Sequence, residues 1–304
     1  MGIEEEIVGM YNQLPFPDYG DNPLDDEYVS QKQFIDLILG FNGHGYSVYK
    51  DKSVLDAGCG TGRESMYLAL QGAKVTAIDI ADSSLKVANE QARKHEFRYD
   101  ISFMKSSVLD MPFEDNQFDI VLSSGVIHHT LYPEKAFSEL VRVLKPNGYI
   151  ILFVYNNFAH MIPNLRRGIV NIFAGEDIHK RVDLAKKLFP GYLKRCNAAR
   201  IYDEFAHPHK SEHSIAEVLS WFYRFGIRYL SVYPKFGFQG FYYTRKGNTI
   251  YKQTGRFIRI DDKFSNPNLL NRLSSGLLQL LRGYRAYSGG YRFLGTKKDG
   301  ALRS

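Results

Sequence analysis

The stretch "KSVLDAGCGTG", residues 52–62, decides the fold of this chain. It begins with a short apolar run and ends in a cluster of glycines, which is typical of a buried strand followed by a tight turn. The next residues, "RESMYLALQG" (63–72), carry apolar side chains at helical spacing and end in a glycine, which predicts a helix. We therefore expect a strand at about 53–56, a glycine turn and a helix, in that order.

The same alternation continues along the first half of the chain. Helices are predicted at 83–96 and near 133–144, and strands within "AKVTAIDI" (73–80), "ISFMKSS" (101–107), "FDIVLSSG" (118–125) and "YIILFVY" (149–155). Strands that alternate with helices predict a parallel sheet covered by helices on both faces. In such sheets, ligands bind at the carboxyl ends of the strands.

The glycine turn does not fit a dinucleotide cofactor. A dinucleotide fingerprint has the spacing G-x-G-x-x-G. Here Gly58, Gly60 and Gly62 are spaced G-x-G-x-G, and Arg63 occupies the position of the last dinucleotide glycine.

Three ordered motifs point to a different family. The segments "VLDAGCGTG" (54–62), "LDMPFEDNQFDIVLSSGVIHHT" (109–130) and "AFSELVRVLKPNGYIILFVY" (136–155) resemble the type-11 group of class I S-adenosylmethionine-dependent methyltransferases. The resemblance covers about residues 52–155. It implies S-adenosyl-L-methionine as cofactor and an α/β fold with a Rossmann-like, seven-stranded sheet. That sheet is mostly parallel with an antiparallel C-terminal strand and has helices on both faces.

The resemblance also implies roles for individual residues. The glycines would let the backbone approach the methionine end of the cofactor, Asp56 would lie near its ammonium group, and Asp79 would accept hydrogen bonds from the ribose hydroxyls. Where the family often has an acid for the adenine amino group, this chain has Ser107. As alternatives, the glycines could only form a turn, Asp79 could cap a helix and Asp56 could be structural. The expected cofactor-binding residues are Asp56, Gly58, Cys59, Gly60, Gly62, Asp79, Ile80, Ser107, Val108 and Ser124.

Two histidines are the candidates for a catalytic base. His128 and His129 follow the fourth predicted strand, which places them near the transferred methyl group, and histidine titrates in the useful range. A base is needed only if the acceptor must lose a proton. The alternative is that either ring packs in the core or bonds to the backbone.

The second half completes the sheet and adds insertions. A core helix is predicted in "SIAEVLSWFYRFG" (214–226), strand six in "IRYLSVY" (227–233) and an antiparallel edge strand in "YRFLGTKK" (291–298). We expect an N-terminal helical or lid segment (1–49), a cofactor-binding core (50–155) and a helical cap insertion (156–213). A core helix and strand (214–234), a second cap insertion (235–289) and a final strand with a tail (290–304) would follow.

The stretch "DEFAHPHKSEHS" (203–214) holds three histidines, His207, His209 and His213. Ser214 and Glu217 form an S-x-x-E capping box, so 203–213 is interpreted as a loop entering the core helix. The histidine spacing is a weak zinc signal, and no metal is expected. The segment is either an ordinary surface loop or part of the acceptor pocket, with Asp203, His207 and His209 touching substrate. The turn-rich segment 11–23 would fold over the cofactor pocket and contribute Tyr11, Phe16 and Tyr19.

Charge is distributed unevenly. Residues 1–150 hold 13 Lys and Arg against 23 Asp and Glu, whereas residues 151–304 hold 26 against 10. The excess of cations is either solvated surface or a face for an anionic partner. Basic and aromatic residues also interleave at 241–260, a pattern typical of RNA binding or of a β-hairpin.

These observations favour a methyltransferase acting on a small or medium-sized, anionic or lipid-like acceptor under a basic aromatic cap. RNA methylation and non-catalytic cofactor binding are the alternatives. No stretch approaches the roughly 18 apolar residues of a membrane span. The two cysteines, Cys59 and Cys196, suggest a reducing cytoplasm. The acceptor atom and the oligomeric state do not follow from the sequence.

Overall fold

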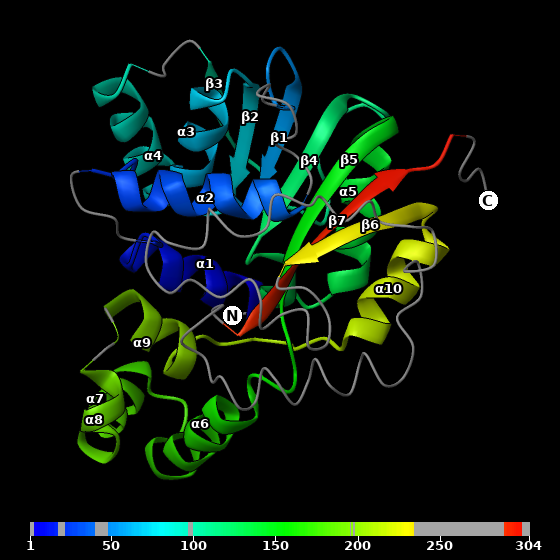
Figure 1. The fold of residues 1–304 in the computed structure, drawn as a ribbon. Helices are drawn as coiled ribbons and strands as arrows, with labels where there is room; N and C mark the ends of the chain where they lie inside the picture. Colours follow the sequence, from blue (N-terminus) through cyan, green and yellow to red (C-terminus); the bar gives the residue numbers. More distant parts are fainter. Residues whose placement is uncertain are drawn as a thin grey trace, which may run out of the picture.

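The computed structural model describes residues 3–17, 22–39, 48–96, 100–194, 196, 198–233 and 289–299. A seven-stranded sheet in the order β3-β2-β1-β4-β5-β7-β6 forms its centre (Figure 1). The strands are β1 (Ser53–Ala57), β2 (Lys74–Asp79), β3 (Ile101–Lys105), β4 (Phe118–Ser124), β5 (Leu144–Tyr155), β6 (Ile227–Tyr233) and β7 (Gly290–Lys297). The Rossmann-like α/β fold expected from the motifs is confirmed. From β1 the chain adds strands first on one side (β2, β3) and then on the other (β4, β5), so the strand order reverses between β1 and β4.

One prediction about the sheet is wrong. β7 is antiparallel, as expected, but it lies inside the sheet between β5 and β6, so β6 forms the edge. Hydropathy shows that a strand is buried and does not show which strands flank it. Lys297 fixes the end of β7 by donating to the carbonyl oxygens of Val141 and Leu144 at 2.8 and 2.7 Å and to Asn116 Oδ1 at 2.8 Å.

Helices cover the two faces of the sheet and create two apolar cores. The core on one face includes side chains of α5 (Pro133–Val143) and α10 (Ile215–Arg224), and the core on the other includes side chains of α2 (Asp26–Leu39), α3 (Arg63–Leu70) and α4 (Asp82–Lys94). The capping box predicted at the start of α10 is confirmed, with both Ser214 and Glu217 making their hydrogen bonds to the backbone.

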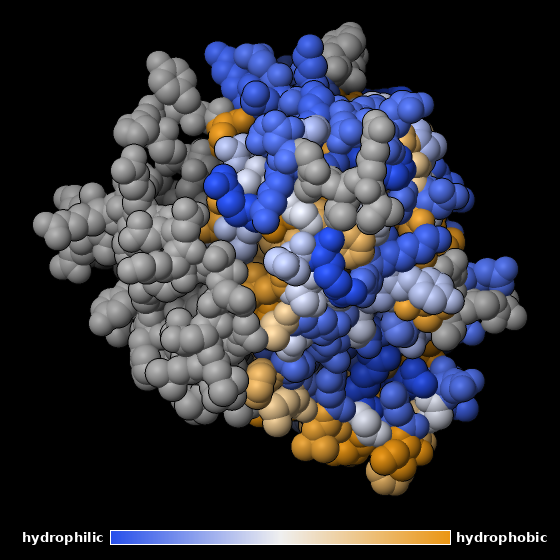
Figure 2. Space-filling view, turned by 90° about the vertical axis from the view of Figure 1, so that its right-hand side faces the viewer, coloured by the Kyte–Doolittle hydropathy of each residue, from blue (hydrophilic) through white to orange (hydrophobic). Residues whose placement is uncertain are grey.

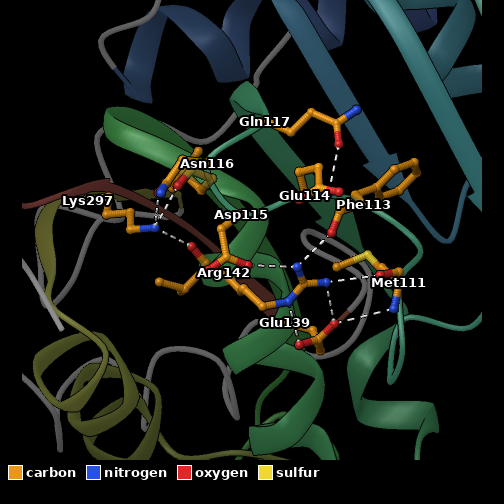
Figure 3. A network of polar contacts seen from close by, with 11 residues as sticks. Met111, Phe113, Glu114, Asp115, Asn116, Gln117, Glu139, Arg142 and Lys297 are labelled. Atoms are coloured by element: carbon orange, nitrogen blue, oxygen red, sulfur yellow. Dashed lines mark hydrogen bonds and ion pairs between the residues drawn. The ribbon is translucent and has the colours of Figure 1, made fainter. Parts of the chain in front are cut away.

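A polar network away from the carboxyl ends of the strands fixes the loop before β4 (Figure 3). Arg142 on α5 donates to the carbonyl oxygens of Met111 and Phe113 at 2.9 and 2.7 Å and pairs with Asp115 and Glu139. The network holds the loop against α5 and leaves the opposite end of the sheet available for ligands.

Two further groups of helices lie at the carboxyl ends of the strands (Figure 1). The N-terminal segment forms α1 (Ile3–Gln13), which packs against α4. Residues 156–213 form α6 (Met161–Ala174), α7 (Ile178–Leu188), α8 (Pro190–Leu193) and α9 (Ala198–Phe205), which share a small apolar core of their own. This group of four helices is called the cap below.

The cap corrects one interpretation made from the sequence. Residues 203–205 belong to α9 and not to a loop, because Ile201 and Phe205 pack into the core of the cap. The second predicted insertion (235–289) lies outside the described residues except for Gly289. The stretch 241–260 also lies outside them. Within the described ranges, no helix has the length and apolar character needed to cross a membrane.

Candidate active site

A cavity of about 540 Å³ lies at the carboxyl ends of β1, β2, β4 and β5. Residues of α1 and α2 also line the cavity, as does Arg292 on β7. This is the place where parallel α/β sheets bind ligands, and the volume lies within the range typical of small-molecule sites.

The glycine turn after β1 forms one wall of the cavity. Gly58, Gly60 and Gly62 have φ angles of 89°, 53° and 82°, in the left-handed region that favours glycine. A Cβ at Gly58 would lie 2.3 Å from Val126 Cγ2, and a Cβ at Gly60 would lie 2.3 Å from the Phe16 carbonyl oxygen. A side chain at Gly58 or Gly60 would therefore clash with other parts of the protein. The sequence suggested a turn or a close approach to a ligand and did not indicate these internal contacts.

Asp79, at the end of β2, is held rigidly beside this turn. Its two carboxylate oxygens accept hydrogen bonds from the backbone of Gly60 at 2.8 Å and of Ala81 at 2.9 Å. Burial raises the pKa of Asp79, and these backbone donors oppose the rise. Each oxygen keeps acceptor capacity for a ligand in the cavity. Ile80, Ser107 and Val108 line the cavity next to it.

Asp56, at the end of β1, lies deeper in the same wall. Its side chain is 1% exposed and accepts a hydrogen bond from Ser65 Oγ at 2.6 Å. Burial, with a smaller contribution from the nearby Glu64, raises the pKa of Asp56 to about 7. A positively charged group brought into contact with Asp56 would stabilise its ionised form. Cys59 also lines the cavity, and burial raises the pKa of its thiol.

A buried ion network, which no sequence motif indicated, also lines the cavity. Glu64, in the first turn of α3, pairs with Lys32 at 2.7 Å and with Arg292 at 3.0 Å. Arg292 also donates to Ser124 Oγ at 2.9 Å. Burial alone would raise the pKa of Glu64, but Arg292 and Lys32 outweigh it and hold the pKa at about 2. No local motif indicates this network, because its hydrogen-bonded pairs are separated by up to 228 residues in the sequence.

The N-terminal segment closes over the glycine turn, and Tyr11, Phe16 and Pro17 line the cavity. The carbonyl oxygen of Phe16 accepts a hydrogen bond from the Thr61 backbone at 3.2 Å, and that of Pro17 accepts one from Thr61 Oγ1 at 2.5 Å. Tyr19, which was also predicted to contact substrate, lies outside the described residues.

Of the two candidate bases, His129 lines the cavity and His128 does not. His129 Nε2 lies 3.3 Å from Asp203 Oδ1, and Tyr155 donates to Asp203 Oδ2 at 2.8 Å. His129 Nδ1 lies 3.4 Å from the carbonyl oxygen of His209. Burial lowers the pKa of His129 to about 4, although Asp203 acts in the opposite direction. The ring is therefore neutral at pH 7.

His128 lies behind His129. It is 0% exposed and its ring centroid lies 4.0 Å from that of Tyr155. Neither ring nitrogen has a hydrogen-bond partner among the described residues, and burial lowers its pKa well below the usual value. This position suits packing better than proton transfer to a ligand in the cavity.

His207 and His209 also lie behind the cavity wall. His207 stacks near His129 with a centroid distance of 4.0 Å, and its Nδ1 accepts a hydrogen bond from the His209 backbone at 3.2 Å. A neutral ring then carries its proton on Nε2, which lies 3.1 Å from the Tyr11 hydroxyl. The predicted substrate contacts Asp203, His207 and His209 are thus outside the lining of the cavity and support His129 and Tyr11 from the cap.

The cluster of histidines does not form a metal centre within the described part of the chain. No group of three or more His, Cys, Asp or Glu there has an arrangement that could hold a metal ion. The third histidine of the stretch, His213, contacts Ser211 and Glu217 at the start of α10.

Comparison with known proteins agrees with this arrangement. Residues 55–152 match the family model described as a methyltransferase domain. The tocopherol O-methyltransferase of Arabidopsis thaliana is 39% identical over 160 residues, which cover 51% of this chain and 46% of that protein. The demethylmenaquinone methyltransferase of Clavibacter sepedonicus is 34% identical over 115 residues (38% and 45% of the two chains). An uncharacterized protein of Synechococcus sp. is 27% identical over 252 residues (75% and 60%).

The aligned regions thus span between 45% and 60% of the length of these relatives. The match to the family model begins within β1, includes the glycine turn and ends within β5. The stretch from β1 to β5 is therefore similar to a methyltransferase domain, and the order of the strands agrees with that similarity.

Proposed function

We propose that this protein is an S-adenosylmethionine-dependent methyltransferase that acts on a small or medium-sized acceptor. The observation that carries the proposal is one cavity with two chemically different ends. The glycine turn, Asp56 and Asp79 line one end, and Tyr11, His129, Phe153 and Tyr155 line the other. When bound, the cofactor supplies a methyl group that is already activated by the positive charge on its sulfur.

The residues of the first end fit this cofactor. Asp79 is fixed by two backbone donors and keeps acceptor capacity for the two hydroxyls of a ribose. Asp56 offers a carboxylate that an ammonium group would keep ionised. Ile80, Ser107 and Val108 provide a mostly apolar wall for an adenine ring.

The second end supports a small acceptor rather than a macromolecule. Its aromatic walls come from three elements, α1, the turn after β4 and β5, and the segment Tyr11–Pro17 covers the cavity at the glycine turn. Lys32 and Arg292 reach the cavity and share the single carboxylate of Glu64, so an anionic group on the acceptor would meet favourable charge. By their names, two of the relatives methylate tocopherol and demethylmenaquinone, which are small molecules.

His129 is the proposed proton acceptor when the acceptor atom has to lose a proton. Asp203 accepts the hydrogen on Nε2 and so leaves the lone pair on Nδ1. In a protonated His129 ring, Asp203 and the His209 carbonyl oxygen, 3.4 Å from Nδ1, would accept hydrogen bonds from the two nitrogens. The neutral form is present above the pKa of about 4 and is lost as the pH falls through that value. Methyl transfer should therefore not depend on His129 titration between about pH 6 and 8.

The test is methyl transfer from radiolabelled S-adenosylmethionine into fractionated cell extract, with and without ribonuclease. We expect label in a low-molecular-weight or lipid fraction, and about tenfold less label with Asp79→Asn when the cofactor is limiting. Label in a ribonuclease-sensitive macromolecule would instead assign the basic second half of the chain to RNA. Cofactor binding without transfer to any fraction would contradict the proposal of an enzyme.

A further inference from the structure

The cap exposes a helix face of unusual composition. Five of the large hydrophobic residues of α6 are exposed: Met161 (54%), Ile162 (48%), Leu165 (67%), Ile172 (78%) and Phe173 (75%). At roughly 100° per residue, these positions share one stripe about 120° wide, and Pro163 and Val170 on the opposite side are buried. An amphipathic helix normally turns its apolar stripe to the core. Here a second apolar stripe, called the α6 stripe below, faces solvent.

The α6 stripe forms part of the molecular surface. Figure 2 shows hydrophobic residues gathered at the lower end of the molecule, where Figure 1 places α6. Single exposed apolar residues are normal, but a contiguous apolar patch marks a contact with another phase or molecule. The stripe lies on the cap and is formed by residues that do not line the cavity.

Basic residues outnumber acidic residues across α6, α7 and α8, the helices that carry and adjoin the α6 stripe. Residues 161–194 hold seven Lys and Arg against three Asp and Glu, and α6 itself contains two arginines and no acid. On α7, which packs beside α6, Lys186 and Lys187 are exposed. Neither forms an ion pair with another described residue. Arg166 lies at the edge of the stripe and stacks on Tyr192, with its guanidinium carbon 4.0 Å from the ring centroid.

We propose that the α6 stripe docks the protein onto the surface of an anionic lipid bilayer. Apolar side chains in one stripe would enter the boundary between headgroups and acyl chains, and the flanking lysines and arginines would meet the lipid phosphates. A second copy of this chain is a poorer occupant, because two such faces would bring like charges together. The inference does not depend on the proposed enzymatic activity.

Flotation with vesicles of phosphatidylcholine that contain about one third phosphatidylglycerol tests this docking. The wild-type protein should float with the vesicles, less at high salt and less with pure phosphatidylcholine. The double variant Ile172→Ser, Phe173→Ser should bind at least roughly tenfold more weakly, because it removes two side chains that the lipid would bury. Lys186→Glu with Lys187→Glu should weaken binding to the anionic vesicles on the order of tenfold.

Matched controls separate docking from general stickiness. Tyr223→Ser on α10 and Leu70→Ser on α3 remove side chains that are 83% and 47% exposed outside the cap, and both variants should float like the wild type. Unchanged thermal unfolding of all variants would show that the fold is intact. Wild-type protein that stays unbound would overturn the proposal. So would Ser variants that bind normally, or self-association that replaces vesicle binding and disappears in the Ile172→Ser, Phe173→Ser variant.

Discussion

The two ends of the cavity are built in different ways. Most of the end with the glycine turn comes from one contiguous stretch, residues 53–79, which runs from β1 to the end of β2. The end with His129 is assembled from α1, the turn after β4, β5 and the cap, and its contacts join residues up to 196 positions apart. The first end therefore depends on local backbone geometry, whereas the second depends on how the cap and the N-terminal helix pack on the core.

The two ends also differ in charge. Asp56 and Asp79 place two carboxyl groups at the first end, which suits a cofactor that carries positive charge. At the second end, burial lowers the pKa of His128, His129 and His207, so the imidazoles there are neutral at pH 7. Neutral rings around the acceptor would hold water less strongly than charged groups would.

The largest effect is expected at the glycine turn. In Gly60→Ala, the new Cβ would lie 2.3 Å from the carbonyl oxygen of Phe16, and a backbone atom cannot move aside cheaply. The hydrogen bond from Gly60 to Asp79 would shift as well, so cofactor affinity should fall by about a hundredfold or more. Equilibrium binding of S-adenosylmethionine measures the effect. Gly9→Ala, where a Cβ meets nothing within 4 Å, is the control, and normal binding by Gly60→Ala would show that the turn is not critical.

A smaller effect is expected where the two ends meet. Glu64→Gln leaves Lys32 and Arg292 buried without their shared carboxylate, and should lower the free energy of unfolding by about 3 kcal/mol. The pKa of Glu64 falls from 4.5 to about 2 on folding. Its contribution to stability is therefore complete above pH 4.5 and is lost as the pH falls toward 2.

Urea unfolding at several pH values checks this prediction. The wild type should lose stability between about pH 4.5 and 2, and Glu64→Gln should lose less over the same range. The control is Glu134→Gln, which breaks the exposed ion pair with Arg224 and should cost less than about 1 kcal/mol. Equal losses in the two variants would mean that the buried network is not a stabilising unit.

The different origins of the two ends explain what the sequence could predict. The glycine turn, Asp56 and Asp79 come from one strand–turn–helix–strand segment that carries the resemblance to methyltransferases, and the structure shows that they line one cavity. The Lys32–Glu64–Arg292 network has no such signature, because packing of α2 and β7 brings its members together. The order of β6 and β7, and the position of His129 rather than His128 at the cavity, likewise depend on contacts between distant segments.

A subtler effect would show whether Asp56 contacts the cofactor's ammonium group. Because its pKa is about 7 in the free protein, Asp56 is partly protonated at neutral pH. Binding of a cation beside it should then release about half a proton at pH 7 and almost none at about pH 9. Calorimetry in buffers with different ionisation enthalpies measures this release, and Asp56→Asn should abolish it. Release that persists in Asp56→Asn would assign the proton to another group.

The most direct test compares one acidic residue from each end of the cavity. Equilibrium binding of S-adenosylmethionine and methyl transfer are both measured for Asp79→Asn and Asp203→Asn. Asp79→Asn should weaken cofactor binding about tenfold or more, because it removes a charged acceptor. Asp203→Asn should bind the cofactor normally and lose about tenfold or more in the rate of transfer, because His129 loses its partner. Loss of cofactor binding in Asp203→Asn, or normal binding in Asp79→Asn, would contradict the assignment of the two ends.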